Sequence, residues 1–93
     1  MKATAELQVI PIGQSVSVRE EIKAVHDLLQ QYDLIVQTHA SGTNLEGTLE
    51  VILEVTSAVH AMLHDQGCVR LVSYLKLETR TDKVPTLAGK ALD

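Results

Sequence analysis

The chain has 93 residues, which suits one domain with a single core. Its 12 acidic and 8 basic side chains give a net charge of -4, whereas nucleic-acid-binding surfaces are strongly basic. No apolar run approaches the length of a membrane span, and the N-terminus lacks the continuous apolar stretch of a signal peptide. We therefore expect one soluble cytoplasmic domain over residues 1–93 that binds neither nucleic acid nor membrane.

The composition also limits the core. Phe and Trp are absent and Tyr occurs twice, so the core must consist of Val, Ile, Leu and Ala. Such a core is shallow, and association between chains would add to it. The single cysteine, Cys68, excludes an internal disulfide and suits a reducing compartment.

The first half of the chain predicts a strand, a helix and a second strand. Residues 3–11 alternate apolar and polar side chains, as in a half-buried strand. Ser17 and Glu20 have the spacing of a capping box, which predicts a helix that begins near Ser17. The buried stripe expected on this helix is Val18, Ile22, Val25 and Leu29. After Asp33, residues 34–40 are rich in β-branched side chains and predict the second strand.

The second half predicts strand, helix and strand. Residues 43–46 form a short strand or an extended arm that Gly47 closes, and a helix follows from Thr48 to about Gln66, with Gly67 as its stop. Its expected core stripe is Ile52, Val55, Val59 and Met62. Residues 68–80 predict a long final strand, and residues 86–93 a short helix after Pro85.

This element order is the split βαβ pattern of the α+β ferredoxin-like sandwich, in which both helices cover one face of an antiparallel sheet. The other face is then uncovered. It is expected to carry Thr4, Glu6, Gln8 and Ile10 from the first strand and Val72, Tyr74, Lys76 and Glu78 from the last. This mixture of apolar and polar side chains predicts contact with another subunit and a small-ligand cavity between the two sheets.

Other residues with chemical potential favour structural roles. His60 and His64 have a spacing that can hold a metal, but no HExxH glutamate accompanies them, so we expect a solvated or subunit-contacting helix face and no metal site. Cys68 has no local group that would lower its pKa, and we expect it to be structural. Neither glycine segment is a phosphate loop. Ser15 nevertheless follows the first strand and precedes a helix, where it can contact a polar ligand.

Several segments together resemble the small thiamine-binding-protein family: AELQVIPIG at residues 5–13, SVS at 15–17, GTNLEG at 42–47 and LKLETRTDK at 75–83. The resemblance implies a ferredoxin-like domain that binds thiamine or its hydroxymethylpyrimidine fragment without catalysis, in a homodimer or homotetramer, with no other cofactor. By position, Glu46, Thr43 and Ser15 match the family's motif residues near the ligand. Glu6 and Gln8 are added as ligand contacts from the uncovered sheet face.

Thiamine is a chemically reasonable ligand for these residues. It carries a permanent positive charge and an aminopyrimidine, which suit a carboxylate and a hydroxyl or amide acceptor. Glu46 is the predicted carboxylate, and Thr43 or Asn44 the predicted acceptor. Asn44 stands where the family commonly has an apolar residue, so it is expected to alter specificity. The alternatives are an oligomeric structural or regulatory module without a ligand, and an enzyme, which lacks support because no nucleophile–base pair or metal set is evident.

Overall fold

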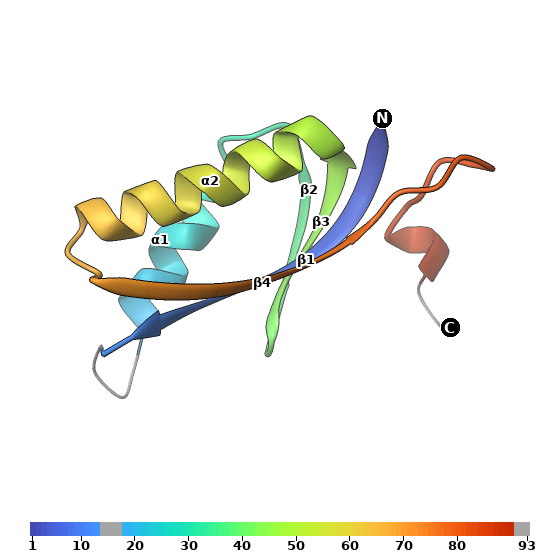
Figure 1. Ribbon diagram of the computed structural model, residues 1–93. Coiled ribbons are helices and arrows are strands. Elements are labelled where there is room, and N and C mark those ends of the chain that lie inside the picture. Colours follow the sequence, from blue (N-terminus) through green and yellow to red (C-terminus); the bar gives the residue numbers. More distant parts are fainter. Residues whose placement is uncertain (14–17, 91–93) are drawn as a thin grey trace.

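The computed structural model describes residues 1–13 and 18–90, and these form a four-stranded sheet with both helices on one face (Figure 1). The elements in chain order are β1 (Lys2–Ile12), α1 (Arg19–Leu29), β2 (Ile35–His39), β3 (Gly42–Thr48), α2 (Leu49–Asp65), β4 (Arg70–Glu78) and a 3-10 helix (Ala88–Lys90). The strand order is β2-β3-β1-β4 and every pairing is antiparallel. The predicted ferredoxin-like fold is confirmed.

The two neighbours of β1 cover different lengths of it. β3 pairs with β1 from Lys2 only as far as Leu7, whereas β4 pairs with it from Thr4 to Ile12. Beyond Leu7, therefore, β1 is paired with β4 along one edge and has no partner strand among the described residues along the other. This free edge faces the space beyond the β2–β3 hairpin and beside α1.

The core lies between the sheet and the helices. Ala3, Ala5 and Leu7 of β1 are buried there, because alternate residues of a strand face the same side. On α2 the predicted Ile52, Val55 and Val59 are buried, but the fourth core residue is Leu63 and not Met62, which is only partly buried. Leu63 lies four residues after Val59 and so stays on the buried side, where it packs beside Cys68.

The predicted start and stripe of α1 need correction. Its N-cap is Val18, which provides no side-chain cap; the predicted cap, Ser17, lies outside the described residues. Leu29 is fully buried, but Ile22 is 53% exposed although the pattern placed it in the core. Helical spacing shows that residues share a face, but only the surrounding elements decide whether that face is covered. Near Ile22 this face of the helix is not covered.

The GTNLEG segment is longer as a strand than predicted. β3 runs from Gly42 to Thr48 and includes Gly47, which the sequence interpretation treated as its end. A Cβ atom at Gly47 would lie 2.5 Å from Leu34 Cδ2, so close packing explains this glycine. Thr48 is the N-cap of α2, where its hydroxyl accepts a hydrogen bond from the Val51 N–H at 3.2 Å.

The face of the sheet opposite the helices is not fully uncovered, contrary to prediction. Leu87, in the C-terminal segment 84–90, donates its N–H to Glu46 Oε1 at 2.7 Å, and Lys90 Nζ lies 2.7 Å from Glu78 Oε1. Thr4, on the same face, is 3% exposed, and Pro85 is buried. The segment therefore covers the part of this face around Thr4.

None of the helices in the described residues is long and apolar enough to cross a membrane.

Candidate functional site

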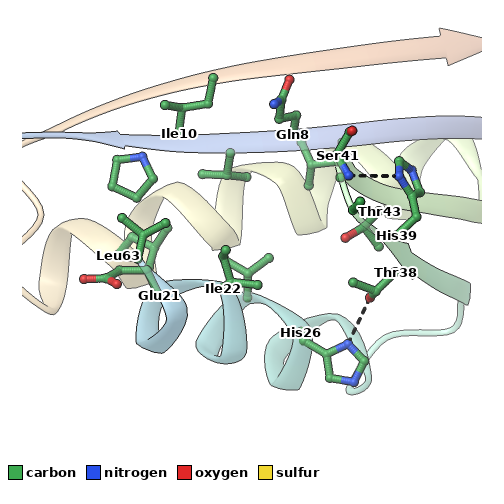
Figure 2. Close-up of a pocket in the computed structure, with 17 residues that line it drawn as sticks. Gln8, Ile10, Glu21, Ile22, His26, Thr38, His39, Ser41, Thr43 and Leu63 are labelled. Carbon is green, nitrogen blue, oxygen red and sulfur yellow. Dashed lines mark hydrogen bonds between the residues drawn. The ribbon is translucent and has the colours of Figure 1, made fainter. Parts of the chain in front are cut away.

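A cavity of about 410 Å³ lies between α1, the second half of β1 and the end of the β2–β3 hairpin (Figure 2). We call it the α1 groove. Its walls are residues 8–11 of β1, residues 38–43 of the hairpin, and Glu21, Ile22, Val25 and His26 of α1 with its N-cap Val18; Leu7 and Leu63 also line it. The volume falls in the range of about 300–1,000 Å³ that is usual for small-molecule sites.

The groove exists because the hairpin is shorter than β1. The hairpin ends at Ser41 and Gly42, so it does not cover the free edge of β1 that begins after Leu7. An unpaired strand edge presents backbone donors and acceptors. The exposed Ile22 lies on the opposite wall. The groove thus combines an apolar wall with hydrogen-bonding groups of the main chain.

The polar side chains of the groove come from α1 and the hairpin. His26 Nδ1 lies 3.2 Å from Thr38 Oγ1, and this hydrogen bond joins α1 to β2 (Figure 2). Thr43 adds a hydroxyl and Glu21 a carboxylate. No Lys or Arg is present among the described residues that line the groove. Its electrostatics therefore favour a neutral or cationic ligand over an anionic one.

His39 lies at the rim of the groove, where the hairpin turns. Its Nδ1 accepts a hydrogen bond from the Ser41 N–H at 3.3 Å, as Figure 2 shows. Its Nε2 lies 3.2 Å from Asn44 Oδ1 and 3.4 Å from Glu6 Oε2. Through this imidazole, the end of the hairpin is tied to polar groups of β3 and β1.

A second cavity, of about 570 Å³, lies on the other face of the sheet, against the C-terminal segment. Its charged lining is of both signs, with Glu6, Lys76, Glu78 and Lys90, and two of these, Glu78 and Lys90, are paired with each other. Asn44 also lines it. Because its charges are of both signs, the lining of this cavity does not favour one sign of ligand charge over the other.

The six predicted ligand contacts do not form one cluster. Thr43 and Gln8 line the α1 groove, although the Gln8 side chain points away from α1 (Figure 2), whereas Glu6 and Asn44 line the second cavity. Glu46 lines neither and binds the Leu87 N–H. Residues 43 and 46 are an odd number apart on one strand, so their side chains point to opposite faces of the sheet. Ser15 lies outside the described residues.

Five polar residues that line the groove were not predicted as ligand contacts: Glu21, His26, Thr38, His39 and Ser41. His26 and Glu21 flank the apolar stripe of α1, which is a weak signal for a groove at the edge of a helix. For Thr38 we find no signal, because its place in the groove depends on where the hairpin ends relative to α1.

The histidines of α2, predicted to lie on a solvated or subunit-contacting face, differ in exposure: His64 is exposed and His60 is not. His60 is partly buried, and its Nε2 lies 2.6 Å from Ser73 Oγ on β4. His64 Nδ1 lies 2.7 Å from the carbonyl oxygen of Cys68. The described residues hold no group of three or more potential metal ligands. Cys68 is buried beside Val59 and Leu63, as expected of a structural cysteine.

The fold and the groove together define a class: a small single-sheet α+β protein with a cavity of small-molecule size between its first helix and the sheet. Comparison with known families makes this specific. The family model described as thiamine-binding protein matches residues 5–92, and the chain belongs to this family.

Relatives and solved structures agree with this assignment. The chain is 40% identical over 90 residues to UPF0045 protein MJ1052 of Methanocaldococcus jannaschii, covering 96% of this chain and 88% of that protein. It is 33% identical to UPF0045 protein sll0230 of Synechocystis, covering 97% and 74%. The crystal structure of MJ1052 gives a TM-score of 0.89 at 38% identity, with 96% and 91% covered. A candidate thiamine biosynthesis/salvage protein of Thermotoga maritima gives 0.85 at 21% identity, with 97% and 95% covered, and so supports the fold alone.

Proposed function

We propose that this protein binds thiamine or a related hydroxymethylpyrimidine in the α1 groove, without catalysis, and acts in the cytoplasm as a carrier, buffer or sensor. The observation that carries the proposal is the lining of the groove: an exposed apolar wall at Ile22, one carboxylate at Glu21, and no Lys or Arg among the described residues. The family's description supports the choice of ligand.

The chemistry of the groove matches the two halves of thiamine. A permanent positive charge is stabilised by a carboxylate in a partly apolar setting, which is the role of Glu21. An aminopyrimidine needs a donor and an acceptor side by side, which the free edge of β1 beyond Leu7 can supply from its main chain. Thr43 adds a hydroxyl that both donates and accepts.

Isothermal titration with thiamine, thiamine phosphates and hydroxymethylpyrimidine tests the proposal. Thiamine should bind more tightly than its phosphates, because Glu21 repels added negative charge. Absence of heat for every one of these compounds at millimolar concentration would overturn the proposal.

Two variants with matched controls locate the site. Ile22→Trp should fill the groove and weaken thiamine binding at least about tenfold, whereas Leu53→Trp, at a residue 49% exposed on α2 outside both cavities, should not. Glu21→Gln should weaken thiamine binding more than Glu20→Gln, because Glu20 does not line the groove. If Glu46→Gln weakens binding and Ile22→Trp does not, the ligand lies on the other sheet face and the groove assignment is wrong.

A second candidate function is an oligomeric structural or regulatory module. It is favoured by Tyr74, which is 64% exposed on β4 and lies opposite Gln8, on the face away from the helices. Assembly into a homodimer or homotetramer through this face would bury that ring. Light scattering of the wild type and of Tyr74→Ser measures this, and a monomeric wild type would exclude it. Ligand binding in the α1 groove does not depend on the result.

A further inference from the structure

His39 connects the two faces of the sheet at the end of the β2–β3 hairpin. Its side chain lies on the same face as Glu6 and Asn44, with which its Nε2 makes contacts of 3.4 Å and 3.2 Å. Its Nδ1 lies 3.3 Å from the N of Ser41. Both His39 and Ser41 also line the α1 groove. No other described side chain in the hairpin contacts groups on both β1 and β3 through hydrogen bonds or ion pairs.

The partners of the ring determine where its proton lies. A backbone N–H can only donate, so Nδ1 must accept from Ser41 and carries no hydrogen. The hydrogen of the neutral ring is therefore on Nε2, from which it is donated to Asn44 Oδ1 or Glu6 Oε2. Protonation of Nδ1 removes the acceptor that holds the Ser41 N–H, while it strengthens the attraction to Glu6.

We propose that His39 is a positioning residue for the α1 groove: its neutral ring holds the Ser41 main chain and fixes the hairpin end that forms one groove wall. In this arrangement Glu6 and Asn44, predicted from the sequence to contact the ligand, act instead on the opposite face by orienting the ring. Ligand binding in the groove then weakens as His39 becomes protonated. The inference rests on the proposed function, since it concerns the same groove.

Charged and titratable groups on both sides of the sheet surround His39 and bear on the effect of its protonation. On the sheet face that carries the His39 ring, Glu6 of β1 lies opposite Lys76 of β4 in the strand register, so a lysine stands on the strand next to the carboxylate partner of the ring. On the groove side, Glu21 and His26 of α1 are the titratable groups. Because His26 is a second imidazole on the groove side, the effect of His39 must be measured as a difference between variants.

The closing experiment compares thiamine affinity at about pH 8 and about pH 5.5 in the wild type, His39→Asn and His39→Ala. The Oδ1 of Asn takes a position close to that of Nδ1, so it accepts from Ser41 but does not titrate. We expect His39→Asn to bind thiamine like the wild type at the higher pH. At the lower pH the wild type should lose about two- to tenfold more affinity than His39→Asn, which corresponds to the free energy of one hydrogen bond. His39→Ala should bind more weakly than the wild type at the higher pH. Equal affinities and equal pH profiles in all three proteins would overturn the proposal.

A measurement without ligand separates this proposal from the proposed function. In the wild type, the amide resonance of Ser41 should move as His39 titrates, whereas in His39→Asn it should not. If thiamine does not bind but the Ser41 resonance follows His39, the function fails and the positioning contact stands. If the Ser41 amide resonance does not move when His39 gains a proton, the positioning contact itself is wrong.

Discussion

The Glu46 carboxylate accepts a hydrogen bond at 2.7 Å from the main-chain N–H of Leu87, which lies 41 residues further along the chain. This bond joins the middle of β3 to the C-terminal segment. It gives the carboxylate of the GTNLEG segment a structural role on the face of the sheet away from the helices.

Glu46→Ala should therefore release the C-terminal segment. We expect a loss of about 1–2 kcal/mol in the free energy of unfolding, because the bond is partly buried and its acceptor is charged. Hydrogen exchange at the Leu87 amide should accelerate. Glu54→Ala, at an exposed position on α2, is the control and should change neither quantity. An unchanged exchange rate at Leu87 would show that other contacts hold the segment.

The same segment should loosen in acid. The hydrogen bond from Lys90 is the main cause that holds the pKa of the Glu78 carboxyl below its usual value of 4.5, with a smaller contribution from Arg80. A carboxyl whose pKa is lowered on folding stabilises the folded state above its unfolded pKa, and this contribution disappears as the pH falls through the folded pKa. We therefore expect the stabilising contribution of this contact to be complete above about pH 4.5 and to be lost progressively at lower pH, as the pH falls through the lowered pKa of Glu78.

NMR titration of the Glu78 side chain measures this effect. In Lys90→Met the pKa of Glu78 should rise toward 4.5, because its main partner is gone. Lys23→Met, which removes a lysine paired with Asp27 on α1, is the matched control and should leave Glu78 unchanged. The idea fails if both variants give the wild-type titration curve.

Ser73→Ala should weaken the contact between α2 and β4. The Ser73 hydroxyl lies 2.6 Å from His60 Nε2, and its loss leaves a partly buried ring nitrogen without this partner. We expect a loss of about 1 kcal/mol in the free energy of unfolding, measured by urea denaturation. Ser57→Ala, at an exposed position on the same helix as His60, should lie within about 0.5 kcal/mol of the wild type. Equal stability of the two variants would contradict the prediction.

Gly47→Ala should strain the packing of β3 against Leu34. The added Cβ would lie 2.5 Å from Leu34 Cδ2 and 3.2 Å from the Asp33 carbonyl oxygen, which predicts a loss of about 1–3 kcal/mol in stability. The double variant Gly47→Ala/Leu34→Ala tests the cause, because removal of the Leu34 branch makes room. The double variant should be more stable than the sum of the two single losses predicts. Simple additivity would place the strain elsewhere.

The fold was predictable because hydrophobic periodicity is a local property. Alternation over residues 3–11 and helical spacing from Ile52 to Val59 each identified an element and its buried side. Errors arose where burial depends on a neighbouring element. Ile22 belongs to the apolar stripe of α1, yet it is exposed because it lines the α1 groove, which the β2–β3 hairpin ends too early to cover.

The candidate site was only partly predictable for a related reason. The family resemblance placed both Thr43 and Glu46 near the ligand, but strand geometry places their side chains on opposite faces of the sheet. Glu21 and His26 join the groove through the position of α1, which short-range patterns do not define. The family resemblance, by contrast, did not depend on geometry, since it rested on segments spread over the whole chain, and the family model confirms it.

By itself, then, the sequence determined the order of elements and most of their buried positions, because these follow from local spacing. Its motif segments, spread over the chain, indicated the family. The tertiary structure alone decided that the hairpin ends before β1 does, which opens the α1 groove. It also decided that the C-terminal segment donates a hydrogen bond to the Glu46 carboxylate. Both are matters of where distant segments meet, and that is set by the balance of packing over the whole chain and not by any short stretch of residues.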